Sequence, residues 1–307
     1  MKKLGWWIGG LIIALIVFSL FLPGTSVTRS SRLVNCTNEA ITRSTVNPSN
    51  WKAWWPGQVL NDSTIEYNQE QYRVEVILLN GFRALRQDRL ERIEFQFLPS
   101  TGDSTVLYLT RTRAAGWNPI ARISHWASQK LNKPGFDPLL DKIAVHFDKP
   151  ENLYGFSIKK GKVIHVSWMS AKKIYDHSPT KEETYHLLDG LRTYIESQNG
   201  AIQAEPILHI RTLENNQSEL MVAYPTDRNL KPNAAYSLKQ MIPGFLLMGE
   251  VTGGPKTIEL AEQNLEFFMR DHKLQSPAIP FQTLITDRST ISDTAKWITR
   301  LNYPVFN

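Results

Sequence analysis

Residue types that could support catalysis occur in this chain, but not at the spacings that enzyme active sites use. The segment Gly253-Gly254-Pro255-Lys256-Thr257 places glycines before a lysine, yet its proline and its glycine register differ from those of a phosphate-binding loop. No Gly-x-Ser-x-Gly elbow occurs, and the single cysteine, Cys36, lies just after a hydrophobic segment. The histidines do not form the His-Glu-x-x-His pattern of a zinc protease; they are His125, His146, His165, His177, His186, His209 and His272. The sequence favours a ligand-binding protein over an enzyme, without a cofactor or a metal centre.

The charge balance argues against nucleic acid as a partner. The formal net charge is +6, but two of the 35 basic residues, Lys2 and Lys3, precede the hydrophobic segment. The rest of the chain has 33 basic and 29 acidic residues. So small an excess does not predict a nucleic-acid-binding surface. The densest basic stretch, residues 159–162, is typical of a solvated hairpin tip. One cysteine also excludes an intramolecular disulfide framework.

The amino-terminal segment predicts a membrane anchor. Residues 5–22 carry no charge, and a helix of that length, about 27 Å, crosses a hydrocarbon core. Two lysines precede it and two tryptophans open it, so residues 1–24 are expected to be a single-pass anchor with a cytoplasmic amino terminus and a periplasmic or otherwise extracytoplasmic bulk. Arg29 and Arg32, which follow the segment, weigh against this orientation. A cleaved signal peptide is the alternative, but residues 21–25 lack the small-x-small cleavage pattern.

Residues 25–150 have the pattern of an α+β domain. A strand is predicted from Ser26 to Val34, a polar helix from Glu39, and further strands over residues 71–80, 93–97 and 106–113, where apolar residues alternate or cluster. Helical spacing follows over residues 120–131 and again after Pro138. The polar, proline-punctuated segment 149–152 marks a boundary, so that residues 151–307 form a second domain.

The strand from Arg29 to Leu33, followed by Asn47-Pro48-Ser49-Asn50-Trp51-Lys52-Ala53-Trp54, resembles the START/polyketide-cyclase-like (SRPBCC) superfamily over residues 26–148. The resemblance implies a helix-grip fold, in which a curved antiparallel sheet wraps a long helix around an apolar cavity. Core packing is the alternative role for Trp51, Trp54 and Trp55.

The second domain repeats itself. One helix is predicted to begin at Ser178-Pro179-Thr180, with Glu183 in capping-box position. A second helix is predicted to begin in the same way at Gly254-Pro255. A strand is expected before each helix, at 163–168 and 244–251, and two strands are expected after each helix. The two copies are offset by 74 residues at Pro206 and Pro280, and by 79 residues at Pro225 and Pro304. The pattern predicts a duplicated strand-helix-strand-strand unit, with one antiparallel sheet, helices on one face and a concave seam along a pseudo-twofold axis.

This duplicated domain resembles the GyrI-like effector-binding family, on the residues Gly249–Leu260, Ala278–Asp287 and Trp297–Val305. The resemblance implies a ligand site at the seam, where relatives use a buried glutamate and aromatic rings to bind cationic aromatic ligands. The matching position is Gln282, and Lys256 stands where an aromatic residue is common, which argues against selection for lipophilic cations and leaves anionic or carbonyl ligands open. The implied ligand-binding residues are Gln282, Phe281, Trp297, Tyr303, Tyr224 and Lys256.

Strand alternation allows only one of Gln282 and Phe281 to line the site, and we expect Gln282. The sequence therefore predicts a membrane-anchored protein that binds or senses a small apolar or aromatic molecule. Two alternatives stay open. One is a cofactor-free hydrolase or cyclase acting on a small electrophile, and the other is an interaction protein of an envelope complex.

Overall fold

The structure is a computed structural model that describes residues 16–19, 21–88, 90–115, 118–131 and 137–306. The chain is α+β and divides into two compact units, Met1–Leu153 and Tyr154–Asn307, each with one antiparallel sheet. Most of the expected anchor lies outside the described residues. Within the described ranges, no helix has the length and apolar composition needed to cross a membrane.

The sheet of the first unit has seven antiparallel strands in the order β1-β7-β6-β5-β4-β3-β2. In chain order they are β1 (Thr25–Val34), β2 (Gln58–Asn61), β3 (Thr64–Tyr67), β4 (Glu70–Leu78), β5 (Gly81–Arg86), β6 (Glu91–Pro99) and β7 (Thr105–Ala114). Along β6 the buried side chains alternate with exposed or half-buried ones, as the period-two pattern predicts. The order leaves β1 and β2 at the two edges.

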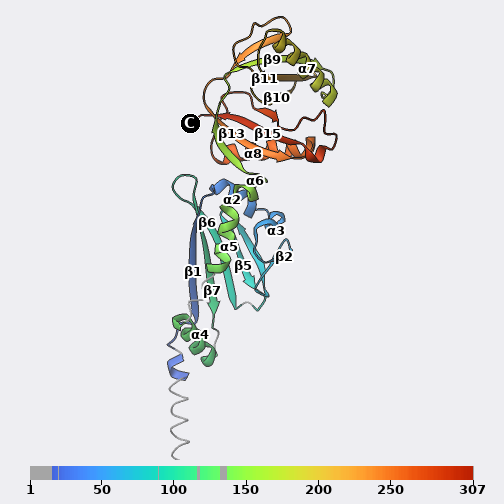
Figure 1. The fold of residues 1–307 in the computed structure, drawn as a ribbon. Helices are drawn as coiled ribbons and strands as arrows, with labels where there is room; N and C mark the ends of the chain where they lie inside the picture. The colour runs from blue at the N-terminus through green and yellow to red at the C-terminus, as the bar shows by residue number, and fades with distance from the viewer. Residues whose placement is uncertain (1–15, 20, 89, 116–117, 132–136, 307) are drawn as a thin grey trace, which may run out of the picture. The chain divides into compact units, whose positions relative to one another are not determined.

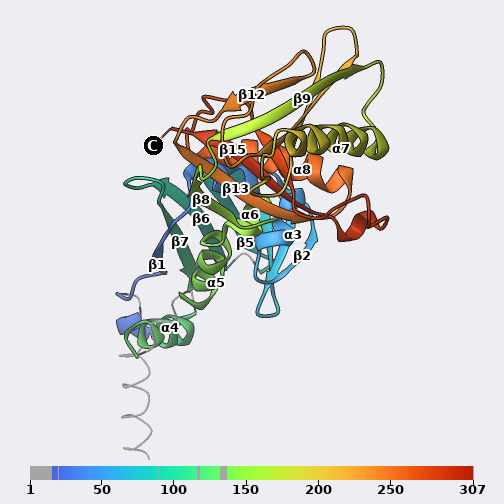
Figure 2. The same cartoon turned by 45° about the horizontal axis from the view of Figure 1, so that its top comes forward.

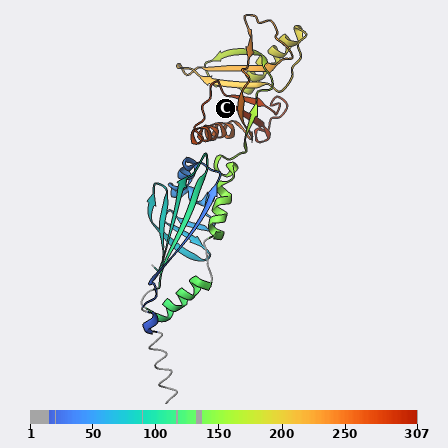
Figure 3. The ribbon, with the colours of Figure 1, turned by 90° about the vertical axis from the view of Figure 1, so that its left-hand side faces the viewer.

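Helices and a 3-10 turn accompany this sheet within the described residues of the first unit. They include α2 (Asn38–Thr45), the 3-10 turn η1 (Pro48–Asn50), α3 (Trp51–Trp54), α4 (Pro119–Leu131) and α5 (Asp137–Phe147). Helices α2, α3 and α5 contact strands of this sheet. Helix α5 packs against β1 and β7 (Figure 1), and Figure 3 shows it running along the sheet. Its apolar residues Leu139, Leu140, Ile143 and Phe147 are buried, which explains why this segment forms an amphipathic helix.

Aromatic side chains fill the space where the sequence resemblance implied an apolar cavity. Trp54 lies with its ring centroid 5.7 Å from those of both Phe95 and Phe147, and Trp51 lies 4.9 Å from Phe82. Trp55 is buried as well. The three tryptophans therefore serve as core residues, because rings at these distances exclude a ligand from between them.

The junction of the two units is a short helix, α6 (Pro150–Tyr154), which overlaps the polar segment 149–152 that marked the boundary in the sequence. Asn152 donates from Nδ2 to the carbonyl oxygen of His146 at 3.0 Å. The polar residues of this segment thus make helical and capping contacts.

The sheet of the second unit has eight antiparallel strands in the order β12-β9-β11-β10-β14-β15-β13-β8. They are β8 (Ile158–Lys162), β9 (Ser167–Tyr175), β10 (Ile207–Thr212), β11 (Ser218–Pro225), β12 (Tyr236–Gln240), β13 (Phe245–Thr252), β14 (Phe281–Leu284) and β15 (Ile298–Val305). Two helices of 17 residues each accompany it, α7 (Lys181–Ser197) and α8 (Pro255–Asp271).

The duplicated unit predicted from the sequence is confirmed in this sheet. The first repeat is β9, α7, β10 and β11, and the second is β13, α8, β14 and β15. Strands β10 and β14 pair at the centre, with Leu208 opposite Gln282. Since the strand order is symmetric about this pair, the pseudo-twofold axis passes between them.

The edge strands depart from the prediction. Residues 159–162 were expected at a hairpin tip but lie in β8, which pairs with β13 of the second repeat. The matching strand β12 pairs with β9 of the first repeat (Figure 2). The expected strand at 163–168 shares only residues 167–168 with β9. Residues 163–166 instead lie beside residues 241–244, where the N–H of Val163 donates to the carbonyl oxygen of Gly244 at 3.0 Å. Each repeat is thus extended at its edge by a strand from outside it. This pairing satisfies backbone N–H and C=O groups that would be unpaired at an open sheet edge.

Both helices of the second unit lie on one face of the sheet, as the pattern predicts. Helix α7 begins with the complete capping box of Thr180 and Glu183, and Pro179 precedes the cap. Helix α8 begins with Gly254 as cap and Pro255 in its first turn. The apolar residues of α7 pack with Leu208 and Leu284, those of α8 with Leu301 and Tyr303. A separate cluster around Trp168 and Phe281 covers the opposite face.

Candidate ligand pocket

A pocket of about 240 Å³ lies over the central pair β10–β14, between the first turns of α7 and α8. Its floor is apolar and includes Leu208 and Leu284 from the two strands. Pro179 precedes α7 and Pro255 opens α8, and both prolines contribute to the wall. An engineered cavity of about 150 Å³ holds a benzene molecule, so this pocket has room for a ligand built on one ring system.

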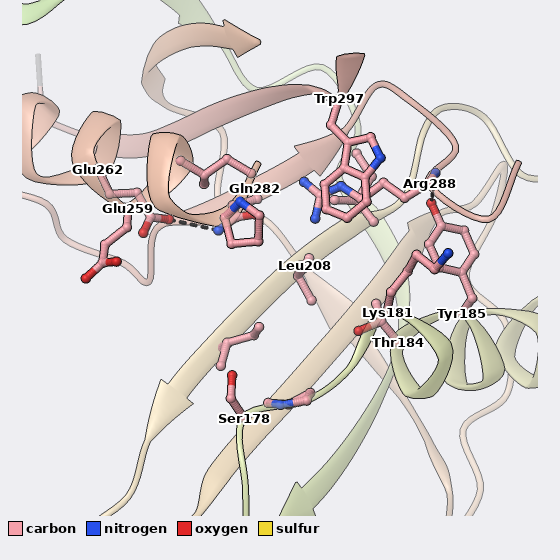
Figure 4. A pocket seen from close by; sticks show the side chains of 15 residues that line it. Ser178, Lys181, Thr184, Tyr185, Leu208, Glu259, Glu262, Gln282, Arg288 and Trp297 are labelled. Atoms are coloured by element: carbon pink, nitrogen blue, oxygen red, sulfur yellow. Dashed lines mark hydrogen bonds between the residues drawn. The ribbon is translucent and has the colours of Figure 1, made fainter. Parts of the chain in front are cut away.

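One end of the pocket carries an amide and a carboxylate. Gln282 donates from Nε2 to Glu262 Oε1 at 3.0 Å (Figure 4). Both side chains are half-buried. Burial raises the pKa of Glu262, and the nearby Glu259 and Glu266 raise it further, while the hydrogen bond from Gln282 acts in the opposite direction. The Glu262 carboxylate at this end is therefore a hydrogen-bond acceptor that is more basic than an ordinary glutamate.

The other end carries a buried arginine. Arg288 is 8% exposed, and its guanidinium lies 4.7 Å from the ring centroid of Trp297 (Figure 4). Its Nη2 donates to Thr299 Oγ1 at 2.7 Å, and its backbone N–H donates to the Tyr185 hydroxyl at 2.5 Å. Burial lowers the pKa of Arg288 and raises the pKa of Tyr185 to about 12. The turn that presents Arg288 is held by Asp287, whose carboxylate accepts from Ser289 N at 2.9 Å.

Two of the six residues expected at the ligand site, Gln282 and Trp297, line this pocket. Phe281 points to the opposite face, in the cluster with Trp168, as strand alternation requires. Gln282 lies on the helix face and finds a partner there in Glu262. Whether these residues bind a ligand stays a prediction.

The other three expected residues are not among those that line the pocket. Tyr224 is 2% exposed in the core beneath α7, and its hydroxyl accepts from Arg192 Nη2 at 2.9 Å. Tyr303 is buried beneath α8, where burial and the charges of Glu262 and Glu266 raise its pKa. Lys256 is exposed in the first turn of α8.

Sequence reasoning missed Glu262 and Arg288. A signal for Glu262 existed, because it follows Ile258 by four positions and precedes Leu265 by three, which places it on the inner face of α8. Arg288 lies in a turn after β14, and no periodicity indicates where a turn residue points. Among the described residues, no group of three or more histidine, cysteine, aspartate or glutamate side chains could hold a metal ion.

Comparison with known proteins identifies similar folds only at low identity. No protein-family model matches the chain, and neither does any curated protein. Among solved structures, the chain is similar to EcmrR in a cryo-EM EcmrR–DNA complex (12% identity, TM-score 0.43, 61% of this chain and 65% of that one). It is also similar to the EcmrR C-terminal domain (12%, TM-score 0.42, 49% and 97%) and to SAV2435 bound to tetraphenylphosphonium (13%, TM-score 0.33, 48% and 93%). All three TM-scores lie below 0.5.

Proposed function

We propose that the second unit binds or senses a small molecule in the pocket over β10–β14. The observation that carries the proposal is the combination of an apolar floor with polar groups at both ends, Glu262 and Gln282 at one and Arg288 at the other. Binding sites for small molecules generally consist of an apolar concave surface with a few placed polar groups that fix orientation. The site belongs to the seam that the duplicated fold creates.

The test uses a neutral aromatic probe and a pair of matched variants. We expect 4-fluorophenylacetamide to bind the full-length protein, as measured by fluorine NMR line broadening. The substitution Ile210→Trp should abolish binding, because Ile210 lines the pocket and is 40% exposed, so that a larger ring can occupy the space. Ile174→Trp is the control, since Ile174 is also an exposed strand isoleucine, at 53%, but is not part of the pocket lining. Equal binding by both variants would contradict the proposal.

We further propose that the second unit is a GyrI-like effector-binding domain and the first a helix-grip domain of the SRPBCC type. Support for the first assignment is the duplicated strand-helix-strand-strand order with its central β10–β14 pair. Support for the second is the seven-stranded antiparallel sheet with α5 against β1 and β7. The aromatic core of the first unit makes the second unit the place to look for a ligand.

The membrane anchor remains a proposal that rests on the uncharged run of residues 5–22. Full-length protein should fractionate with membranes, and carbonate washing should leave it there. Protease added to intact spheroplasts should digest the bulk of the chain if the amino terminus is cytoplasmic. A shortened protein recovered from the soluble extracytoplasmic fraction would instead indicate a cleaved signal peptide.

A second candidate function follows from Glu262. A half-buried carboxylate with a raised pKa beside an apolar pocket could serve as a general base for water attack on a small electrophile. Hydrolysis of 4-nitrophenyl acetate by wild type that Glu262→Gln reduces to the uncatalysed rate would favour this hydrolase. Unchanged turnover in Glu262→Gln would exclude it.

A further inference from the structure

The arginine at the end of the pocket carries a charge that the described residues do not balance. Arg288 is more than nine-tenths buried, and no ion pair joins it to a carboxylate anywhere in the described part of the chain. Its Nε is buried and has no hydrogen-bond partner among the described residues. Its Nη2 reaches only the neutral hydroxyl of Thr299. The side chain is therefore anchored at one nitrogen.

Burying a lone cation is unfavourable, and proteins normally pair buried charges. A guanidinium does not escape the cost by losing its proton, because it remains protonated in proteins. The contact with Trp297, 4.7 Å from ring centroid to Cζ, contributes some attraction but does not neutralise the charge. The neighbouring Asp287 is exposed and engages Ser289 instead.

The pocket is also lined by a lysine, whose ammonium lies 3.5 Å from Glu182, and by the first turns of two helices. Lys181 opens α7 and lines the pocket, and Pro255 at the first turn of α8 lines it too. The first turns of two helices, which carry partial positive charge, thus converge on the same hollow. The negative groups, Glu262 and Glu259, lie at the far end, beside Gln282 (Figure 4).

We propose that the pocket binds a small organic carboxylate with a flat apolar body, whose carboxylate pairs with Arg288. The planar guanidinium fork matches a carboxylate in two parallel hydrogen bonds. A singly charged carboxylate suits the one unbalanced arginine better than a doubly charged phosphate does, because Glu262 and Glu259 also face the pocket. The ring of the ligand would lie over Leu208 and beside Trp297, and a hydrogen-bond donor on the ligand would reach Glu262 or Gln282. This inference rests on the proposed function and specifies its ligand.

A set of three probes of nearly equal shape tests the charge preference on the unaltered full-length protein. They are 4-fluorophenylacetate, its neutral amide 4-fluorophenylacetamide, and the cation 4-fluorophenethylamine, each titrated by fluorine NMR. We expect the acid to bind about ten- to hundredfold more tightly than the amide, since hydrogen bonds to charged groups are the stronger ones. The amine should bind most weakly.

The variant Arg288→Met should remove the preference, so that acid and amide bind alike and the amide keeps its wild-type affinity. Arg270→Met is the matched control, because Arg270 is an exposed arginine at the end of α8 that does not belong to the pocket lining, and it should leave the preference intact. The wild-type ratio needs no variant, so the proposal stays testable if Arg288→Met fails to fold.

The outcomes separate the two proposals. Equal binding of acid and amide by wild type would overturn the carboxylate proposal and leave small-molecule binding standing. Tighter binding of the amine would overturn it as well and would assign the selectivity to Glu262. If none of the three probes binds, both proposals fail for ligands of this size.

Discussion

The two repeats of the second unit share a backbone plan but differ in the layer of side chains between helix and sheet. Helices α7 and α8 have the same length and begin 74 positions apart, and Leu208 and Gln282 are the same distance apart along the chain. In the first repeat Leu188 and Leu208 meet in the core. At the matching positions of the second repeat stand Glu262 and Gln282, joined by a hydrogen bond of 3.0 Å.

This difference shows how a duplicated fold can acquire a site without changing its backbone. Two other inner positions stay matched, with Leu191 and Ile195 of α7 corresponding to Leu265 and Met269 of α8, all buried, whereas Thr184 of α7 corresponds to Ile258 of α8. The layer formed by Glu262 and Gln282 is polar in the second repeat and apolar in the first. Because Leu208 and Gln282 pair at the pseudo-twofold axis, Leu208 of the first repeat lines the pocket together with Glu262 and Gln282 of the second.

The largest expected effect contrasts the two helices at the matched positions. Leu188→Ala should destabilise the second unit by about 2–5 kcal/mol, because Leu188 is fully buried and its loss leaves a cavity. Glu262→Ala should cost no more than about 1.5 kcal/mol, since it removes one hydrogen bond at a half-buried site. Urea unfolding of the full-length protein, with hydrogen exchange of peptides from residues 154–307, measures both. Equal losses in the free energy of unfolding would contradict the view that Leu188 serves packing whereas Glu262 does not.

The next effect comes from converting the second repeat toward the first. Gln282→Leu should destabilise by about 1–3 kcal/mol, because it leaves the carboxylate of Glu262 without its donor. The double change Glu262→Leu with Gln282→Leu should restore the stability or exceed it, since it recreates the leucine pair of the first repeat. The same unfolding measurement gives the coupling energy. Additive losses would contradict a functional pair at these positions.

Much of the fold could be predicted because its signals are local. The caps at Thr180 and Gly254, the apolar spacing of the two helices and the alternation in β6 each depend on near neighbours in the sequence, and each predicted the element that forms. The exchanged strands β8 and β12 could not be predicted in this way. Their partners lie in the other repeat, and residues 158–162 show charge rather than alternation.

The site was predicted only in part, for a related reason. Aligning the two helices by their shared period would have placed Glu262 opposite Leu188 and hence on the inner face, so this residue was within reach of the sequence. Arg288 was not, because its position depends on a turn that Asp287 and the hydroxyl of Tyr185 fix, and Tyr185 is 103 positions away in the chain. Contacts of that kind arise from tertiary packing and leave no pattern in the local sequence.

The smallest expected effect concerns the pH dependence of the polar layer. Burial raises the pKa of Glu262 above its ordinary value of 4.5, and Glu259 and Glu266 on the same helix add to the rise. Between the ordinary and the raised pKa, the folded protein holds more protons on this group than the unfolded chain does. Stability from this group is therefore present at low pH, falls as the pH rises through that window, and stays constant above it.

The variant Glu262→Gln isolates this contribution, because it keeps the size of the side chain and an acceptor for Gln282 but cannot ionise. The free energy of unfolding of wild type minus that of the variant should be largest below pH 4.5 and decrease as the pH rises. Solvent screens a half-exposed carboxylate, so the change should be smaller than that for Gln282→Leu. Urea unfolding from pH 4 to pH 8 measures the difference, and the transition that Leu188→Ala shifts identifies the second unit. A difference that grows with pH would mean that Glu262 gains a cationic partner on folding, and would contradict a raised pKa for this carboxyl group.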